Sequence, residues 1–194
     1  AHLSAASATG LCVTIPVLLM EPYRWERVRA WLNRTEDISA IGYQAYQSLI
    51  SLGNGGFIGL GLGNSLEKNM FLPEPHTDFI FSIIGEEMGF VGTLFILTLF
   101  LLVFQRGIRI AKECTDPFGV MLAVGISFSF ILYAFVNAAV VTNVFPVTGL
   151  PMPLISYGGS GMVTNLASMG ILLNISQAKR SISYSNDWKP KLYG

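Results

Sequence analysis

One acidic side chain, Asp78, stands where it could act as a general base. It ends the run LPEPHTD (residues 72–78), in which Pro73 and Pro75 hold the chain extended. A helical pattern resumes at Asp78 and continues unbroken into an apolar stretch, which predicts Asp78 in the first helical turn with Thr77 as N-cap. Unpaired backbone N–H groups favour an ionised carboxylate at that position. The pattern fits either an available base or a carboxylate that only stabilises a helix start.

A cation could be offered nearby by Lys68, which follows a stretch with seven glycines between Gly42 and Gly63. The glycines predict a tightly folded re-entrant or surface loop. They match neither G-x-G-x-x-G nor a phosphate-binding loop, which argues against a nucleotide site. Lys68 could neutralise a phosphate, or it could simply be solvated. The two histidines, His2 and His76, form no zinc-binding pattern, and there is no G-x-S-x-G motif of a serine hydrolase.

A second segment with chemical potential is Val144 to Ser160, which holds three prolines, three glycines and no charge. Such a segment cannot form a continuous helix. At membrane depth it is tolerated only where protein or a water-filled cavity covers it. We therefore expect it to form a cavity wall facing the segment that holds Asp78. Asn137, in the preceding apolar stretch, is expected to hydrogen-bond across helices rather than to touch substrate.

The composition indicates the environment of these residues. Of 194 residues, 52% are hydrophobic and 12% are charged, with a mean hydropathy of +0.53. Soluble domains carry roughly 25% charged residues, so the composition excludes a disordered chain, a coiled coil and an ordinary soluble enzyme. The net charge is zero, which argues against nucleic acid as a partner. Cys12 and Cys114 share no motif and predict no disulfide framework.

The expected fold class is an all-α integral membrane protein with about four transmembrane helices and a large extracytoplasmic loop containing short amphipathic helices. One of these amphipathic helices is predicted at Tyr23 to Leu32, where Trp25 and Trp31 suit the headgroup level. The expected segments are transmembrane helices at 1–20, 88–105, 119–145 and 154–177, an extracytoplasmic loop at 21–87, a cytoplasmic loop at 106–118, an extracytoplasmic re-entrant loop at 146–160 and a cytoplasmic tail at 178–194.

The orientation follows from the short loops. Residues 106–118 hold three basic residues and the chain after Ser176 holds four, whereas residues 146–160 hold none. The positive-inside rule therefore places the first two in the cytoplasm. The basic residues of 21–87 count for less because that segment exceeds the length over which the rule is reliable.

Several runs together resemble one known family. They are GYQ followed by QS (42–48), GGFIGLGLGNSLEK (55–68), LPEPHTDFIF (72–81), GEEMGF (85–90) and PVTGLPMPLISYGGS (146–160). The chain resembles the shape, elongation, division and sporulation (SEDS) family, which includes FtsW, RodA and SpoVE. The form GLGNSLEK is closer to division-type FtsW and its sporulation relative than to elongation-type RodA. The sequence departs from the family at residues 32–37 and at Thr148, where a lysine is frequent.

The resemblance implies that the chain is the C-terminal part of a ten-helix protein and supplies its last four helices. It also implies a peptidoglycan glycosyltransferase of the bacterial inner membrane, which polymerises lipid II and works with a class B penicillin-binding protein. Asp78 matches the catalytic aspartate. The expected substrate-binding residues flank it or lie in the second segment: Lys68, Glu74, His76, Thr77, Ser156, Tyr157, Gly158, Gly159 and Ser160.

The implied chemistry needs one base and a positive charge. A pyrophosphate leaves without being protonated, so a glycosidase-like pair of carboxylates is unnecessary. The charge could come from Lys68, an arginine of residues 24–34 or a divalent cation such as Mg²⁺ or Mn²⁺. Two alternatives stay open: a lipid II flippase, and a non-catalytic scaffold for a penicillin-binding protein.

Overall fold

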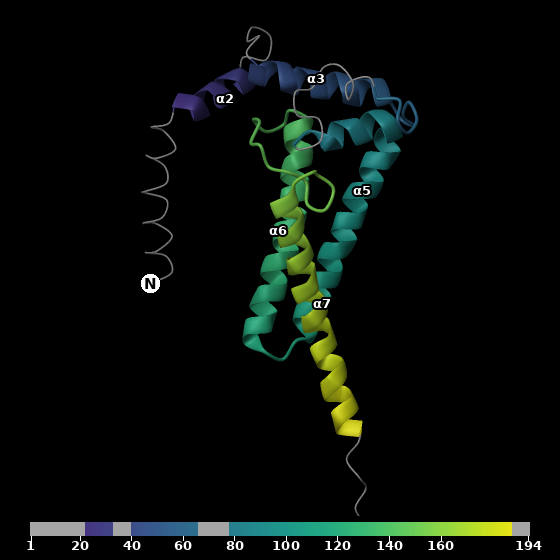
Figure 1. Cartoon of the computed structure of the whole chain (residues 1–194), viewed down its shortest axis with the longest axis vertical. Coiled ribbons are helices and arrows are strands. Elements are labelled where there is room, and N and C mark those ends of the chain that lie inside the picture. Colours follow the sequence, from purple (N-terminus) through teal and green to yellow (C-terminus); the bar gives the residue numbers. More distant parts are fainter. Residues whose placement is uncertain (1–21, 33–39, 66–77, 188–194) are drawn as a thin grey trace, which may run out of the picture.

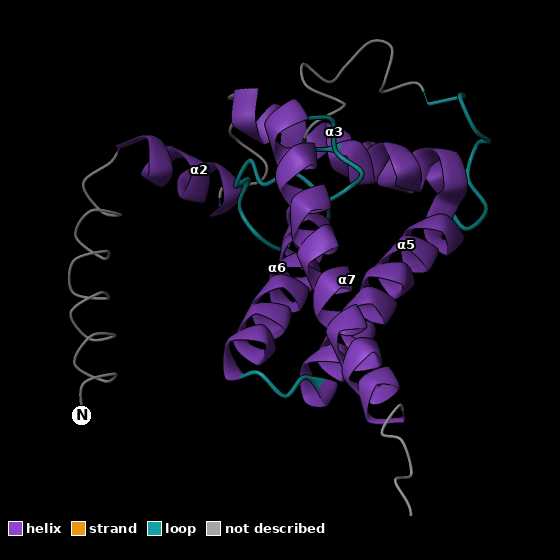
Figure 2. Cartoon of the chain, turned by 60° about the horizontal axis from the view of Figure 1, so that its bottom comes forward, coloured by secondary structure: helices purple, strands orange, loops and turns teal. Residues whose placement is uncertain are grey.

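The computed structural model describes residues 22–32, 40–65 and 78–187. In this part the chain is helical and has no strand (Figure 2). The helices are α2 (Pro22–Leu32), α3 (Ala40–Gly55), α5 (Ile80–Glu113), α6 (Pro117–Val141) and α7 (Gly159–Asp187). Figure 1 shows α2 and α3 lying across one end of the three longer helices, at the end where α6 meets the 142–158 segment.

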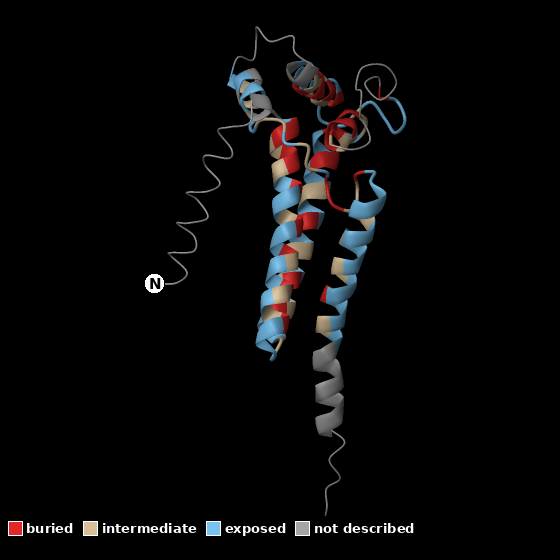
Figure 3. Cartoon of the chain, turned by 60° about the vertical axis from the view of Figure 1, so that its left-hand side comes forward, coloured by how far each residue is buried: buried red, intermediate tan, exposed pale blue. Residues whose placement is uncertain are grey.

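Two of the described helices, α5 and α6, are long and apolar enough to cross a membrane. Large apolar side chains on both are exposed, among them Phe95, Leu102, Phe128 and Phe135. Figure 3 shows exposed residues along the outer sides of these helices and buried residues where they face each other. An apolar exterior of this extent suits a lipid environment better than water.

The helix expected at 23–32 is confirmed as α2, which begins at Pro22, where the missing N–H of proline costs nothing. The glycine-rich stretch from Gly42 to Gly63 was predicted to be a loop throughout. This prediction is wrong for residues 42–55. Residues 40–55 form α3, because the run YQAYQSLISL between the glycines is free of breakers. The loop begins only at Gly56, whose φ is +52°.

The prediction of an unbroken helix from Asp78 through the apolar stretch is also wrong. Gly89, inside α5, has φ 68° and ψ −168°, so the helix is kinked there. The kink leaves backbone groups without helical partners, and the glycine-rich loop supplies them. Leu60 N–H donates to Glu86 O at 2.9 Å and Phe90 N–H donates to Gly56 O at 2.9 Å. Loop and kink therefore form one hydrogen-bonded unit.

The two connections after α5 are defined by local chemistry. Asp116 caps α6 by accepting a hydrogen bond from Gly119 N–H at 2.8 Å, and Pro117 follows it. The last helix, α7, begins at Gly159 rather than at Leu154, where the sequence predicted its start. Leu154 has φ 63°, which no continuous right-handed helix tolerates.

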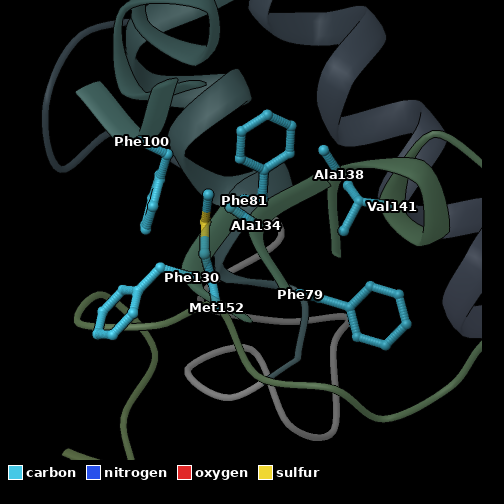
Figure 4. Close-up of a cluster of buried hydrophobic side chains, with 8 residues drawn as sticks. All are labelled: Phe79, Phe81, Phe100, Phe130, Ala134, Ala138, Val141 and Met152. Atoms are coloured by element: carbon cyan, nitrogen blue, oxygen red, sulfur yellow. The ribbon is translucent and has the colours of Figure 1, made fainter. Parts of the chain in front are cut away.

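The main core lies where α5, α6 and the 142–158 segment meet (Figure 4). Phe79 and Phe81 at the start of α5 pack there with Met152 from the connecting segment. Close approach of α5 and α6 further along depends on small residues: a side chain at Gly107 would overlap the hydroxyl of Ser127. The core therefore holds the start of α5 against the 142–158 segment. Asp78 lies just before this start, so the core also places Asp78 near that segment.

Candidate active site

Asp78 lies just before α5, not in its first turn as the sequence predicted. The helix begins at Ile80, with Phe79 as the capping residue and no capping hydrogen bond from that side chain. In a regular helix the carbonyl of Asp78 would accept from Ser82 N–H. Here Ser82 N–H donates to Phe79 O at 3.0 Å, and the Asp78 carbonyl accepts instead from Asn137 Nδ2 at 2.8 Å. A side chain of α6 thus bonds the carbonyl that Ser82 N–H would bond in a regular helix.

Asn137 was expected to hydrogen-bond across helices, and it does bond outside its own helix, but its partners Asp78 and Leu150 lie in connecting segments. Its side chain is 1% exposed, and Nδ2 also donates to Leu150 O at 2.8 Å. The same amide therefore joins the residue before α5 to the 142–158 segment.

The carboxylate of Asp78 lies beside Gly149. A Cβ built on Gly149 would be 3.3 Å from Asp78 Oδ2 and 3.9 Å from Arg27 Nη1. Gly149 has φ +72°, a conformation that other residues adopt only with strain. The absence of a side chain at Gly149 thus leaves room for a carboxylate and a guanidinium to approach the same point.

Arg27 reaches this point from α2. Its Nη1 donates to Val147 O at 2.9 Å, and four residues later Trp31 Nε1 donates to Asn143 O at 3.1 Å. The sequence pattern does not distinguish Arg27 from the other arginines of residues 24–34. The signal that could have done so is the i, i+4 spacing of Arg27 and Trp31, which places both on one face of the helix.

A cavity of about 660 Å³ adjoins the start of α5. Its lining joins the first residue of α5 with the end of the 142–158 segment and the start of α7: Ile80, Ile155, Ser156, Tyr157, Gly158, Gly159 and Met162. The expected juxtaposition of this segment with the chain around Asp78 is therefore present. Tyr157 is exposed, whereas Ser156 is buried and its Oγ accepts from Met152 N–H at 2.7 Å.

Five of the predicted substrate-binding residues are not among the described residues that line this cavity. Ser160 lines a different cavity, between α6 and α7 and about 640 Å³ in volume, rather than the one beside Ile80. Lys68, Glu74, His76 and Thr77 lie outside the described residues. Within the described ranges, no three His, Cys, Asp or Glu side chains gather in a way that could hold a metal ion.

A buried acidic residue, Glu86, supports the same end of the fold. Its side chain is 0% exposed, and Oε2 accepts from Ser51 Oγ at 3.2 Å and from Ser65 Oγ at 2.5 Å. Ser51 belongs to α3 and Ser65 to the end of the glycine-rich loop, so one carboxylate ties both to α5. No sequence pattern indicates this role of Glu86, because the two serines lie 35 and 21 positions away.

A helical chain with two membrane-length apolar helices and a carboxylate–guanidinium site at one end is matched by known proteins. Residues 1–181 match the family model described as cell cycle protein, for FtsW, RodA and SpoVE. The chain is 46% identical to the probable peptidoglycan glycosyltransferase FtsW of Geobacter sp. (strain M18), over 88% of this chain and 46% of the relative. It is 44% identical to stage V sporulation protein E of Bacillus subtilis, over 93% of this chain and 49% of the relative.

Comparison of the fold with solved structures points to the same family as the sequence matches. A solved structure of a peptidoglycan synthase complex that coordinates polymerization and crosslinking matches with a TM-score of 0.69 and 30% identity, over 91% of this chain and 48% of that one. The chain therefore belongs to the FtsW/RodA/SpoVE family, the SEDS membrane proteins. It spans about half the length of the curated relatives it matches.

Proposed function

We propose that this chain carries the catalytic aspartate of a peptidoglycan glycosyltransferase, which polymerises lipid II into glycan strands for division, sporulation or elongation. The observation that carries the proposal is the approach of the Asp78 carboxylate and the Arg27 guanidinium to one point over Gly149. Family membership and the names of the relatives support the reaction class. A base beside a cation is what transfer from a sugar pyrophosphate to a hydroxyl requires.

The proposed reaction transfers one proton, forms one glycosidic bond and breaks one bond between the sugar and the pyrophosphate. Asp78 takes the proton of the acceptor hydroxyl, whose oxygen then bonds to the anomeric carbon of the donor sugar. The bond from that carbon to the pyrophosphate oxygen breaks, and its electron pair leaves with the pyrophosphate. Because the leaving group departs as an anion, no general acid has to face Asp78 across the reacting bond.

Arg27 is the proposed source of positive charge for the departing pyrophosphate. It is half-buried on α2 and its position is fixed by the bond to Val147 O. A planar guanidinium with several donors suits phosphate oxygens. Lys68 and a divalent cation (Mg²⁺ or Mn²⁺) are the other proposed sources, and Glu74, His76 and Thr77 are proposed to flank the base. Ser156, Tyr157, Gly158, Gly159 and Ser160 are proposed to line the substrate path.

We further propose that the chain supplies the last four of ten transmembrane helices in the bacterial inner membrane, with the site on the extracytoplasmic side. Support comes from the apolar exterior of α5 and α6 and from the exposed basic residues Arg106, Arg109 and Lys112 at the far end of α5. Basic residues of that kind favour the cytoplasmic side. The proposed partner is a class B penicillin-binding protein, since the matching solved structure is of a peptidoglycan synthase complex.

Polymerisation of purified lipid II by the full-length protein with its partner tests the proposal. Glycan strands should form with the partner's transpeptidase inhibited. Movement of lipid II across vesicles without polymerisation would indicate a flippase instead. Neither activity, together with intact partner binding, would indicate a scaffold.

A further inference from the structure

Asn137 is buried on α6 and lies between two segments of the site, the residues just before α5 and the 142–158 segment. Its helix, α6, packs against α5, and its amide nitrogen contacts two carbonyls, those of Asp78 and Leu150, each at 2.8 Å. Both contacted atoms are acceptors, so the amide must present its nitrogen to them. Asn137 Oδ1 is buried without a hydrogen-bond partner among the described residues. What the side chain contributes here is therefore its two donors.

The bond to Asp78 determines the local backbone. It turns the Asp78 carbonyl away from Ser82 N–H, and Ser82 instead bonds Phe79 O through both N–H and Oγ, at 3.0 and 2.7 Å. Asp78 is consequently left outside the helix. The carboxylate of a non-helical residue can face Gly149, where the Arg27 guanidinium also approaches.

The bond to Leu150 fixes the other side of the same gap. Leu150 is the neighbour of Gly149, so the amide that holds the Asp78 backbone also holds the wall that its carboxylate faces. In the sequence, Asp78 is 59 positions and Leu150 is 13 positions from Asn137. One side chain thus bonds both segments, in addition to the core that packs them together.

We propose that Asn137 is a positioning residue for the glycosyl transfer: it holds Asp78 at the distance from Gly149 and Arg27 at which the carboxylate can accept the proton. This inference rests on the proposed function. Asn137 itself touches no substrate, and its effect passes through Asp78. A small misplacement of a reacting group can cost about 10²-fold in rate, so its loss should lower kcat and leave lipid II binding intact.

The test is lipid II polymerisation by the full-length protein in its partner complex. Asn137→Leu keeps the approximate size and removes both donors, and we expect kcat to fall about 100-fold with KM within twofold. Asn137→Ser, whose short hydroxyl can donate to one carbonyl at most, should lose less. The matched control is Ser127→Ala, which removes a buried hydroxyl on the same helix that donates to Ala123 O within that helix. It should polymerise at the unaltered rate.

Two readouts separate positioning from a purely structural role. In an Asp78→Asn background, adding Asn137→Ser should cause no further loss, because residues that act through one another are not additive. Equal lipid II affinity and equal partner binding should accompany the lost turnover. Unchanged kcat in both Asn137 variants, or activity lost only in proportion to folded complex, would overturn the proposal. An unaltered complex that makes no glycan would instead contradict the proposed function itself.

Discussion

Arg27 donates a hydrogen bond to the carbonyl of Val147 across 120 positions of sequence. The contact docks α2 onto the 142–158 segment and brings a guanidinium to the gap beside Asp78. Among the described residues, the positive charge at the site therefore comes from Arg27 of α2. The sequence had also suggested Lys68, in the loop that precedes Asp78.

Arg27→Gln should remove this charge while keeping a hydrogen-bond donor. Polymerisation should fall by about 10²-fold or more, as when one electrostatic contact to a developing anion is lost. Arg29→Gln is the matched control, because Arg29 is on the same helix, carries the same charge and is exposed. Equal losses in the two variants, measured as initial rates of glycan formation, would contradict the role assigned to Arg27. Activity that instead disappears with EDTA and returns with Mg²⁺ or Mn²⁺ would add a metal to the site.

Gly149→Ala should disturb the site directly. The new methyl group would lie 3.3 Å from Asp78 Oδ2 on a backbone with φ +72°, so both the carboxylate and the loop must shift. We expect a strong loss of turnover with little loss of folded protein. Gly53→Ala is the control, since nothing lies within 4 Å of that position on α3. Normal turnover in Gly149→Ala would show that the gap between Asp78 and Gly149 is not part of the reaction.

The kink of α5 predicts a stability effect. Gly89→Ala places a Cβ 2.5 Å from Gly59 N and Phe57 O, on a backbone with φ +68°. Strain of this kind costs about 1–3 kcal/mol before the clash is counted. The melting temperature of the full-length protein should drop, whereas Gly170→Ala, with open space around it on α7, should leave it unchanged or higher. An unchanged melting temperature for Gly89→Ala would contradict the kinked backbone.

The buried carboxylate of Glu86 makes a related prediction. Glu86→Leu leaves Ser51 and Ser65 without this acceptor and should loosen α3 and the glycine-rich loop from α5. Loss of a buried hydrogen-bonded network of this kind costs several kcal/mol. Protease should then cleave the 56–65 loop faster. Cleavage at the unaltered rate would mean that the carboxylate does not hold the loop.

The proposed orientation is testable with cysteines. In a Cys12→Ser background, an impermeant maleimide added outside intact cells should label Asn54→Cys, which is exposed at the end of α3. It should not label Cys114, which follows α5 at the other end of the fold. Labelling of Cys114 from outside would reverse the topology and remove the site from the extracytoplasmic face.

Sequence patterns predicted those features that depend on local chemistry. The helix predicted at residues 23–32 and the two long apolar helices follow from charge and hydropathy, and the break in helix before α7 follows from the prolines and glycines of residues 144–160. The kink at Gly89 does not, because it depends on hydrogen bonds that a distant loop supplies to the broken helix. The non-helical position of Asp78 likewise depends on Asn137, 59 positions away. Long-range side-chain contacts of this kind leave no periodic signal in the sequence.

The central claim, that Asp78 is the base, is tested most directly by Asp78→Asn in the full-length complex with lipid II. The substitution keeps the size of the side chain and removes its ability to take a proton. Asp116→Asn is the control: Asp116 is another aspartate placed just before a helix, at the far end of the fold, and asparagine caps a helix equally well. Polymerisation should fall by about 10²–10⁴-fold for Asp78→Asn and stay normal for Asp116→Asn, with folding and partner binding intact in both. A folded, partner-bound Asp78→Asn complex that polymerises lipid II at the unaltered rate would contradict the account.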